Sequence, residues 1–316
     1  MHHTRYSRGL KQAAAALALL AAASCSKPEP AADASLKGLP MWVIKDADST
    51  IYLTGTVHML PPDLDWKSAK LETALKDADE LWLELPMKSD QVEMMRDVGP
   101  IMMRRMFSFN RPLSSLLTDE EEQQLAAAAE RAKLPPQTVK GFENMKPWAV
   151  TMMLGMGPLV ASGYDPAEGV DLNLLKMAED QGDTVKGLET FEQQMDLLAG
   201  GTEEEQLAGL RAALAAPPAA MEELQKQSEA AYEAWAKGDP KPIEELMTSM
   251  AAGGPGMEGM SIEAMLYNRN EDWAGQIEKL LAGEGVSFIA VGAGHLVGPK
   301  NVQERLKLRG IEAERY

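Results

Sequence analysis

The sequence is poor in cysteine, in aromatic residues and in positive charge. A single cysteine among 316 residues excludes a disulfide scaffold, and the lack of several long apolar runs excludes a protein with many membrane spans. Since 48 acidic side chains stand against 31 basic ones, for a formal charge of −17, nucleic acid is not an expected partner. The remaining composition, 45% hydrophobic and 25% charged, is typical of one or two globular domains.

Residues 1–24 have the features of a bacterial lipoprotein signal peptide. Basic residues precede an apolar stretch, 13–23, that is too short to span a bilayer as a mature helix. The stretch ends in Ala22-Ala23-Ser24-Cys25, which resembles the bacterial lipobox, with Cys25 as the acylated residue. The alternative is an ordinary secretory peptide that leaves a free thiol. Because Ser26 follows the cysteine, we expect an exported protein with a lipid anchor in the outer membrane, facing the periplasm.

Strand patterns lie near both ends of the exported chain, and the region between them is mostly helical. Residues 25–38 resemble a flexible tether. The patterns predict a hairpin over 41–45 and 50–55, buried strands over 80–85 and 285–292, a short strand over 184–188 and an edge strand over 311–315. Helices are predicted over 67–78, over 299–309 and over most of the middle region, about 90–282. We therefore expect an α+β fold in one domain, residues 39–316.

Three helix starts are predicted from side chains that satisfy the first free amides. Thr118 with Glu121 and Thr202 with Glu205 have the spacing of capping boxes. Asp171, before an apolar helical pattern, is predicted to be a simple N-cap.

The exported chain contains two histidines, His58 and His295, and both lie in the pattern Gly-x-x-His after a predicted strand. A glycine at the strand end lets the backbone turn, so each imidazole is presented at the carboxyl edge of a sheet, where ligand sites lie in open α/β sheets. Imidazole at such an edge binds a metal or transfers protons near neutral pH. Two hydrogen-bonded structural histidines are the alternative, but the repetition of the motif favours function.

Two glutamates follow predicted strands. Glu84 lies in the run Leu-Trp-Leu-Glu-Leu-Pro, where burial of an unpaired carboxylate costs on the order of several kcal/mol. Its place therefore predicts a cation or metal as partner. Glu189 follows the strand predicted over 184–188 in a similar way. The alternatives are a solvated strand edge and, for Glu189, interaction with the dipole of a helix that begins near Phe191.

Methionine is abundant, with 21 residues, many of them between 94 and 106 and between 145 and 156. Thioethers bind copper(I), so a copper site is one hypothesis. The helical spacing favours packing instead, or an adaptable groove of the kind that suits a peptide.

Six short segments occur in a recognisable order between residues 39 and 316. They are 51–58 with the first Gly-x-x-His, Leu83-Glu84-Leu85, Gly169-Val170-Asp171, 187–194, Arg269-Asn270, and 291–296 with the second Gly-x-x-His. Their order and spacing resemble the TraB/GumN family, which is related to the Tiki proteases. The likeness spans nearly the whole exported chain.

The resemblance implies a mixed central sheet, built from two related halves, whose histidines and glutamates meet at one cleft. It implies a divalent-metal-dependent hydrolase that acts on a peptide or small protein substrate and uses Mn or Co, with Zn as another option. Carried over to this chain, the metal ligands are His58, Glu84 and His295, the catalytic residues are Glu84, Glu189, Arg269 and Asn270, and the substrate-binding residues are Gly55, Gly292 and Arg269.

Three alternatives remain open at this point. The protein is a hydrolase, or it is a non-catalytic lipoprotein that binds or sequesters a peptide, haem or metal in the same cleft, because coordination and catalysis need the same residue types. The third is an envelope interaction protein that uses its acidic helical insert. Arg269 has its own alternative, a surface ion pair with Glu271 or Asp272.

Overall fold

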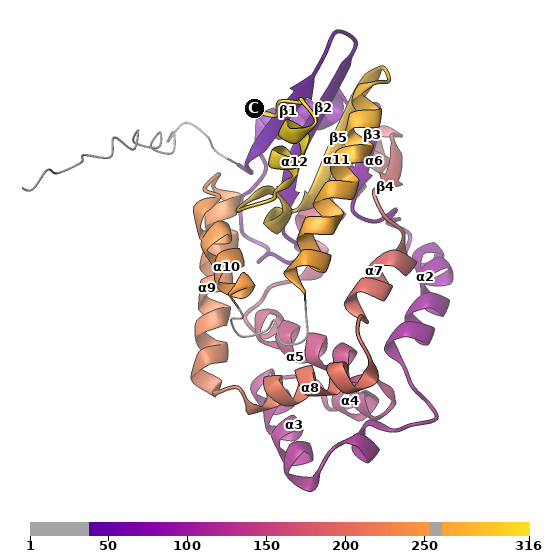
Figure 1. Ribbon diagram of the computed structural model, residues 1–316, viewed down its shortest axis with the longest axis vertical. Helices are drawn as coiled ribbons and strands as arrows, with labels where there is room; N and C mark the ends of the chain where they lie inside the picture. Colours follow the sequence, from indigo (N-terminus) through magenta and orange to yellow (C-terminus); the bar gives the residue numbers. More distant parts are fainter. Residues whose placement is uncertain (1–37, 253–260) are drawn as a thin grey trace, which may run out of the picture. The chain divides into compact units, whose positions relative to one another are not determined.

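The computed structural model describes residues 38–252 and 261–316, which contain one mixed sheet and a large helical region (Figure 1). The predicted signal peptide, Cys25 and the tether up to residue 37 lie outside the described residues. The α+β fold with a large helical insert is confirmed. Within the two described ranges, no helix is both long and apolar enough to cross a membrane.

The sheet has six strands in the order β4-β3-β5-β2-β1-β6. They are β1 (Met41–Lys45), β2 (Ser49–Thr56), β3 (Glu80–Leu83), β4 (Thr184–Gly187), β5 (Gly285–Gly292) and β6 (Glu314–Arg315). The hairpin β1–β2 and the central place of β5 are confirmed, and the edge strand is shorter than predicted. Since β4, β3, β5 and β2 pair in parallel, their carboxyl ends lie at the same edge of the sheet.

Four helices accompany the sheet. They are α1 (Ala69–Lys76), α6 (Val170–Gln181), α11 (Asn268–Leu281) and α12 (Val302–Leu308). Figure 1 shows α11 and α12 in front of the sheet, and α6 packs against β3 and β4. The core contains the fully buried residues Leu53, Leu81, Phe288 and Ile289, as expected for strands covered on both faces.

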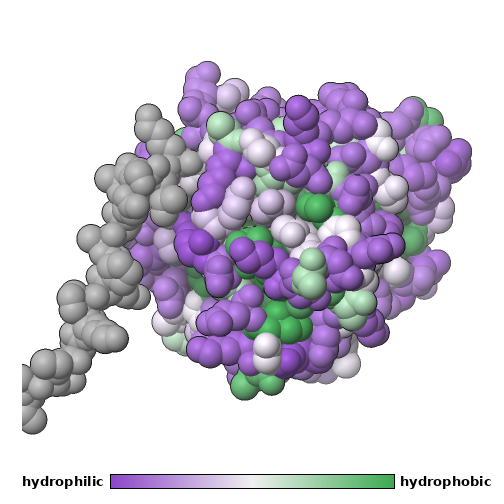
Figure 2. Space-filling model, turned by 90° about the horizontal axis from the view of Figure 1, so that it is seen from above, coloured by the Kyte–Doolittle hydropathy of each residue, from purple (hydrophilic) through white to green (hydrophobic). Residues whose placement is uncertain are grey.

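The helical region has a core of its own around Phe142, Val150 and Leu210. Its helices are α2 (Gln91–Met106), α3 (Asp119–Arg131), α4 (Pro136–Gly141), α5 (Pro147–Ala161), α7 (Phe191–Leu198), α8 (Glu203–Ala215), α9 (Pro218–Ala236) and α10 (Lys241–Ala251). Short helical turns are η1 (Leu113–Leu116), η2 (Phe142–Asn144), η3 (Pro166–Glu168), the π-helical η4 (Glu263–Tyr267) and η5 (Ala293–Leu296). In the face seen in Figure 2, hydrophilic residues cover most of the surface and hydrophobic ones lie in small groups between them.

The helix caps are partly as predicted. Both capping boxes, at Thr118 and Thr202, are confirmed, and a third is present at Thr190. The prediction that Asp171 is an N-cap is wrong, because α6 begins at Val170 and its N-cap is Gly169.

The reason is a close approach between two segments. A Cβ on Gly169 would lie 2.3 Å from the carbonyl oxygen of His58, and Val170 N donates to Val57 O at 2.9 Å. Only glycine fits at the N-cap position, so Asp171 lies within the first turn of α6 and its carboxylate is directed to His58.

Candidate functional site

The two Gly-x-x-His motifs lie side by side at the carboxyl edge of the sheet. Strands β2 and β5 pair in parallel, with Gly55 opposite Val291. His58 follows β2 by two residues, and His295 lies in η5, directly after β5. Because parallel strands end at the same edge, two histidines far apart in the sequence come to one place.

Glu84 joins the two histidines. It follows β3, and its Oε1 accepts a hydrogen bond from Gly292 N at 2.6 Å and lies 3.7 Å from His295 Nε2. A Cβ on Gly292 would lie 3.0 Å from Glu84 Oε1, 3.6 Å from His295 Cδ2 and 4.0 Å from His58 Nε2. Both rings and the carboxylate therefore lie close to Gly292, and a side chain there would press on the Glu84 carboxylate.

Arg269, in the first turn of α11, ties the glutamates together. Its Nη2 donates to Glu84 Oε2 at 2.6 Å and to Glu189 Oε1 at 2.5 Å, and its Nε donates to Glu189 Oε2 at 3.1 Å. Its Nη1 donates to His295 Nε2 at 3.0 Å. The arginine is only 11% exposed, so this is a buried network of one cation and two carboxylates.

One alternative raised by the sequence is therefore wrong. Arg269 does not pair with its neighbours in α11, since Glu271 instead pairs with Arg305 and Arg309. Glu189 directly precedes the N-cap of α7, so its interaction with the helix dipole stays an alternative, but its carboxylate is also bonded to Arg269.

Both imidazoles are anchored through Nδ1. His58 Nδ1 lies 2.8 Å from Asp171 Oδ2, and His295 Nδ1 lies 2.6 Å from Asn270 Oδ1, whose Nδ2 donates to Lys300 O at 2.9 Å. Since a carboxylate or amide oxygen only accepts, each Nδ1 carries the hydrogen, and each ring presents a lone pair at Nε2 when it is neutral. This is the arrangement that histidine ligands of metals adopt.

Burial and neighbouring charges shift the pKa values of His295, Glu84 and His58 strongly. Burial lowers the pKa of His295 to about 3, against the attraction of Glu84, so its imidazole is neutral. Burial alone would raise the pKa of Glu84, but the cations facing it, His295 when protonated and then Arg269 and His58, lower it to about 2. The Asp171 carboxylate raises the pKa of His58, which is largely exposed, to about 9. The site therefore favours a positive charge at His58.

Glu189 differs from Glu84. Burial raises its pKa, although Arg269 opposes this change. It also lines a cavity of about 450 Å³, together with Gln193, Asp272 and Gln276. This cavity gives the cluster an opening toward solvent on the side of α7 and α11.

Three residues of the site were not predicted in these roles from the sequence. Asp171 anchors His58, Gln194 Nε2 donates to Glu189 Oε1 at 3.0 Å, and the Trp273 ring lies 4.4 Å from that of His295. Trp273 follows Arg269 by four residues in α11, and the guanidinium lies 4.6 Å from the centre of its ring. Residues four apart on a helix are neighbours, so this contact could have been predicted from the sequence.

Gly55 has a different environment from Gly292. A Cβ at position 55 would lie 2.2 Å from Trp235 Cζ2, and the Gly55 carbonyl accepts the Trp235 indole N–H at 3.0 Å. The structure thus places Gly55 against α9, and its predicted contact with substrate stays a prediction.

Imidazole nitrogens and carboxylate oxygens are atoms that bind divalent ions, but one of them, His295 Nε2, is already bonded to Arg269. Within residues 38–252 and 261–316, no group of three or more His, Cys, Asp and Glu side chains is arranged to hold a metal. Arg269 Nη1 donates to His295 Nε2, so this lone pair is already used. The two imidazoles, anchored through Nδ1, and the Glu84 carboxylate are nevertheless side chains of the types that bind divalent ions.

Comparison with known proteins identifies the family. A model of the TraB/PrgY/gumN family matches residues 40–315, so the chain belongs to this family and the resemblance found in the sequence is confirmed. A protein of Treponema pallidum (strain Nichols), described as uncharacterized, is 23% identical over 285 residues, which cover 85% of this chain and 80% of its own length.

Proposed function

We propose that this chain is a divalent-metal-dependent hydrolase that cleaves peptides or small proteins at the carboxyl edge of its sheet. The observation that carries the proposal is the paired anchoring of His58 and His295 through Nδ1 near Gly292, with His295 Nε2 3.7 Å from the buried carboxylate of Glu84. Two structural histidines need not lie at one sheet edge with a buried carboxylate.

The net charge of the cluster supports a cation. With both imidazoles neutral, as metal coordination requires, Glu84, Glu189 and Asp171 contribute −3 and Arg269 contributes +1, for a formal charge of −2. A divalent ion held by His58, Glu84 and His295 balances this charge. Mixed imidazole and carboxylate ligands suit Zn and also Mn or Co.

The remaining groups have the chemistry that hydrolysis needs. A bound divalent ion supplies Lewis-acid chemistry, which activates water and polarises a carbonyl group. Glu189, beside the cavity, accepts the proton of the attacking water and passes it to the leaving amine. Arg269 stabilises the negative charge that develops on the carbonyl oxygen, and Asn270 positions His295.

The proposal includes the location of the protein in the bacterial cell. The sequence supports export, lipidation of Cys25 and attachment to the outer membrane facing the periplasm. Metabolic labelling with a fatty acid tests this, because label should be incorporated by the full chain and lost in Cys25→Ala.

Metal content and cleavage together test the proposed activity. Protein purified without a histidine tag should contain near-stoichiometric divalent metal, which the double variant His58→Ala, His295→Ala should lack. A peptide library with Mn, Co or Zn should be cleaved by the wild type and not by Glu84→Gln. Glu80→Gln, the same change at the other end of β3, is the matched control and should retain cleavage. Metal retained by the double variant, or cleavage retained by Glu84→Gln, contradicts the proposal.

The second candidate is non-catalytic binding of a peptide, haem or metal in the same cleft. The hydrogen bond from Arg269 to His295 Nε2 favours it, since that lone pair is already used. This candidate predicts ligand binding without cleavage under every metal condition.

A further inference from the structure

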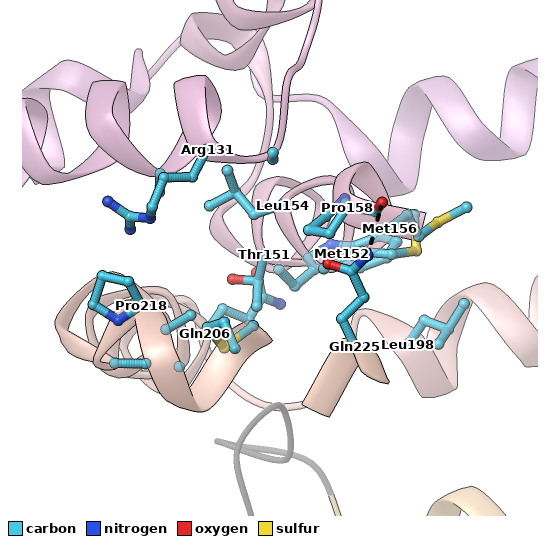
Figure 3. Close-up of a pocket in the computed structure, with 18 of the residues that line it drawn as sticks. Arg131, Thr151, Met152, Leu154, Met156, Pro158, Leu198, Gln206, Pro218 and Gln225 are labelled. Carbon is cyan, nitrogen blue, oxygen red and sulfur yellow. Dashed lines mark hydrogen bonds between the residues drawn. The ribbon is translucent and has the colours of Figure 1, made fainter. Parts of the chain in front are cut away.

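A second cavity, of about 530 Å³, lies within the helical region. Helices α3, α5, α8 and α9 form its walls (Figure 3). Its apolar lining includes Trp148, Met152, Leu154, Met156, Leu198 and Met221. This volume is within the range of pockets that bind small ligands or peptide side chains, about 300–1,000 Å³.

The lining is mostly apolar, with two amide side chains and the charged residues Arg131, Glu205 and Glu222. Figure 3 shows Arg131 and Pro218 near one end of the cavity and Leu198 near the other. Gln206 and Gln225 lie among the apolar residues, and Gln225 Nε2 donates to Pro158 O at 3.5 Å. Both amides also donate within the protein, Gln206 to Ala199 O at 2.6 Å and Gln225 to Glu229 Oε1 at 2.8 Å. The match to an apolar peptide segment therefore rests on the methionines, whose side chains adapt to different shapes.

Helix α7 connects this cavity with the candidate active site. Leu198, its last residue, lines the helical cavity, while Gln193 and Leu197 line the cavity beside Glu189. The helix has eight residues and is therefore about 12 Å long. An extended peptide covers this length with about four residues, at 3.3–3.6 Å each.

We propose that the helical cavity binds an apolar segment of the peptide substrate, about four or more residues from the bond that is cleaved. This inference rests on the proposed function, because it takes the ligand to be a peptide substrate. Binding of an apolar peptide in the cavity does not itself require catalysis. The apolar side chains enter between α5, α8 and α9, and the chain continues past Leu198 toward Arg269. Preferred substrates therefore carry a run of apolar residues away from the cleavage site.

A substitution that fills the cavity tests the proposal. Gly155 lines the cavity from α5, and a Cβ built there meets nothing within 4 Å, so Gly155→Leu adds volume without a backbone clash. Leucine is also a better helix former than glycine. Gly141, in α4, has the same open surroundings and is not among the residues that line the cavity, so Gly141→Leu is the matched control.

The probe is a fluorescein-labelled peptide of 12 residues with four consecutive leucines, and its counterpart has serines in their place. Fluorescence polarisation on the full chain, in the His58→Ala background to prevent cleavage, gives Kd. Gly155→Leu should raise the Kd of the leucine peptide at least tenfold, and Gly141→Leu should change it less than twofold. The serine peptide should bind weakly to every variant. With active protein, Gly155→Leu should raise KM and leave kcat unchanged.

The outcomes separate this inference from the proposed function. Equal binding of the leucine peptide by Gly155→Leu and by its parent overturns the inference, whether or not the wild type cleaves peptides. Binding of sodium laurate that depends on Gly155, without binding of the leucine peptide, also overturns it and identifies a lipid site. If Gly155→Leu does not fold, the test is photocrosslinking of the parent chain with a leucine peptide that carries a photoreactive residue. That peptide should crosslink to α5, α8 or α9 of the parent chain, and crosslinking elsewhere or none overturns the inference.

Discussion

Strand β3 has a glutamate near each end, and the two carboxylates are held in different ways. Glu80, at the amino end, accepts hydrogen bonds from Trp82 Nε1 at 2.6 Å and from Ser287 Oγ at 3.0 Å. It also pairs with Lys186, whose side chain is 42% exposed. All these partners lie on strands of the same sheet, so Glu80, whose own side chain is 18% exposed, joins neighbouring strands at a partly exposed edge.

Glu84, after the carboxyl end, is enclosed. Its side chain is 9% exposed, and its partners come from α11, from α7 and from the last residue of β5. The partners of both glutamates are remote along the chain, but Glu84, at 9% exposure against 18% for Glu80, is more buried, and two helices contribute to its partners. Bonds from helices to a buried carboxylate, rather than a glutamate in a strand, distinguish the candidate site.

The largest expected effect is that of Arg269→Ala on stability. The change leaves Glu84 and Glu189 buried without their cation, which costs about 3–5 kcal/mol for a broken buried ion pair. Urea unfolding in the presence of a chelator measures it, and added Mn²⁺ should restore part of the loss by supplying another cation. An unfolding free energy equal to that of the wild type would show that the buried network is not needed for folding.

Arg309→Ala is the control for this comparison. Arg309 pairs with Glu271 and Glu278 on the surface, where screening by water makes ion pairs weak. The unfolding curve of this variant should coincide with that of the wild type.

The anchor of His295 gives the next largest effect. Asn270→Ala removes the acceptor of the Nδ1 hydrogen, and loss of such an anchor lowers metal affinity about 10–100-fold. Titration calorimetry with Mn²⁺ or Co²⁺ measures the change, and Asn270→Asp, which keeps an oxygen at this position, should recover most of the affinity. Equal affinity in wild type and Asn270→Ala would remove His295 from the set of metal ligands.

Gly55→Ala distinguishes packing from substrate binding. Because a Cβ at position 55 would lie 2.2 Å from Trp235, the change should cost about 1–3 kcal/mol of stability through overpacking. The folded fraction should bind and cleave peptides with an unchanged KM if the contact with Trp235 is the whole role of Gly55. A higher KM at normal stability would instead support the predicted contact with substrate.

Much of the fold is predictable because its causes are local. The segment 285–292 is a nearly continuous apolar run, which suits a strand covered on both faces, and β5 is such a strand. Each predicted capping box is set by residues three positions apart, and both are present. That the histidines and Glu84 lie at one edge of the sheet was implied by the family resemblance and follows from the parallel pairing of β2, β5 and β3.

The anchors of the site were not predictable in the same way. Asp171 contacts His58 across 113 positions, and the contact depends on the close approach of Gly169, so local chemistry indicated only a helix cap. Arg269 presented the same difficulty, since nearby acids offered a local partner while its actual partner Glu84 is 185 positions away. Patterns within a few residues predict elements, and contacts between distant elements decide which side chains are functional.

The smallest expected effect completes the comparison of the two glutamates. Although burial alone would raise the pKa of Glu80, hydrogen bonds from Lys186, Trp82 and Ser287 lower it. A lowered pKa stabilises the fold above the pKa of the unfolded chain, and this stabilisation disappears as the pH falls through the folded-state value. Because Lys186 is exposed, Glu80→Gln should cost about 1 kcal/mol or less at pH 7, and the difference from the wild type should vanish in acid. Urea unfolding of both chains at neutral and acid pH measures it. A difference that persists in acid would mean that Glu80 acts through its shape or packing and not through its charge.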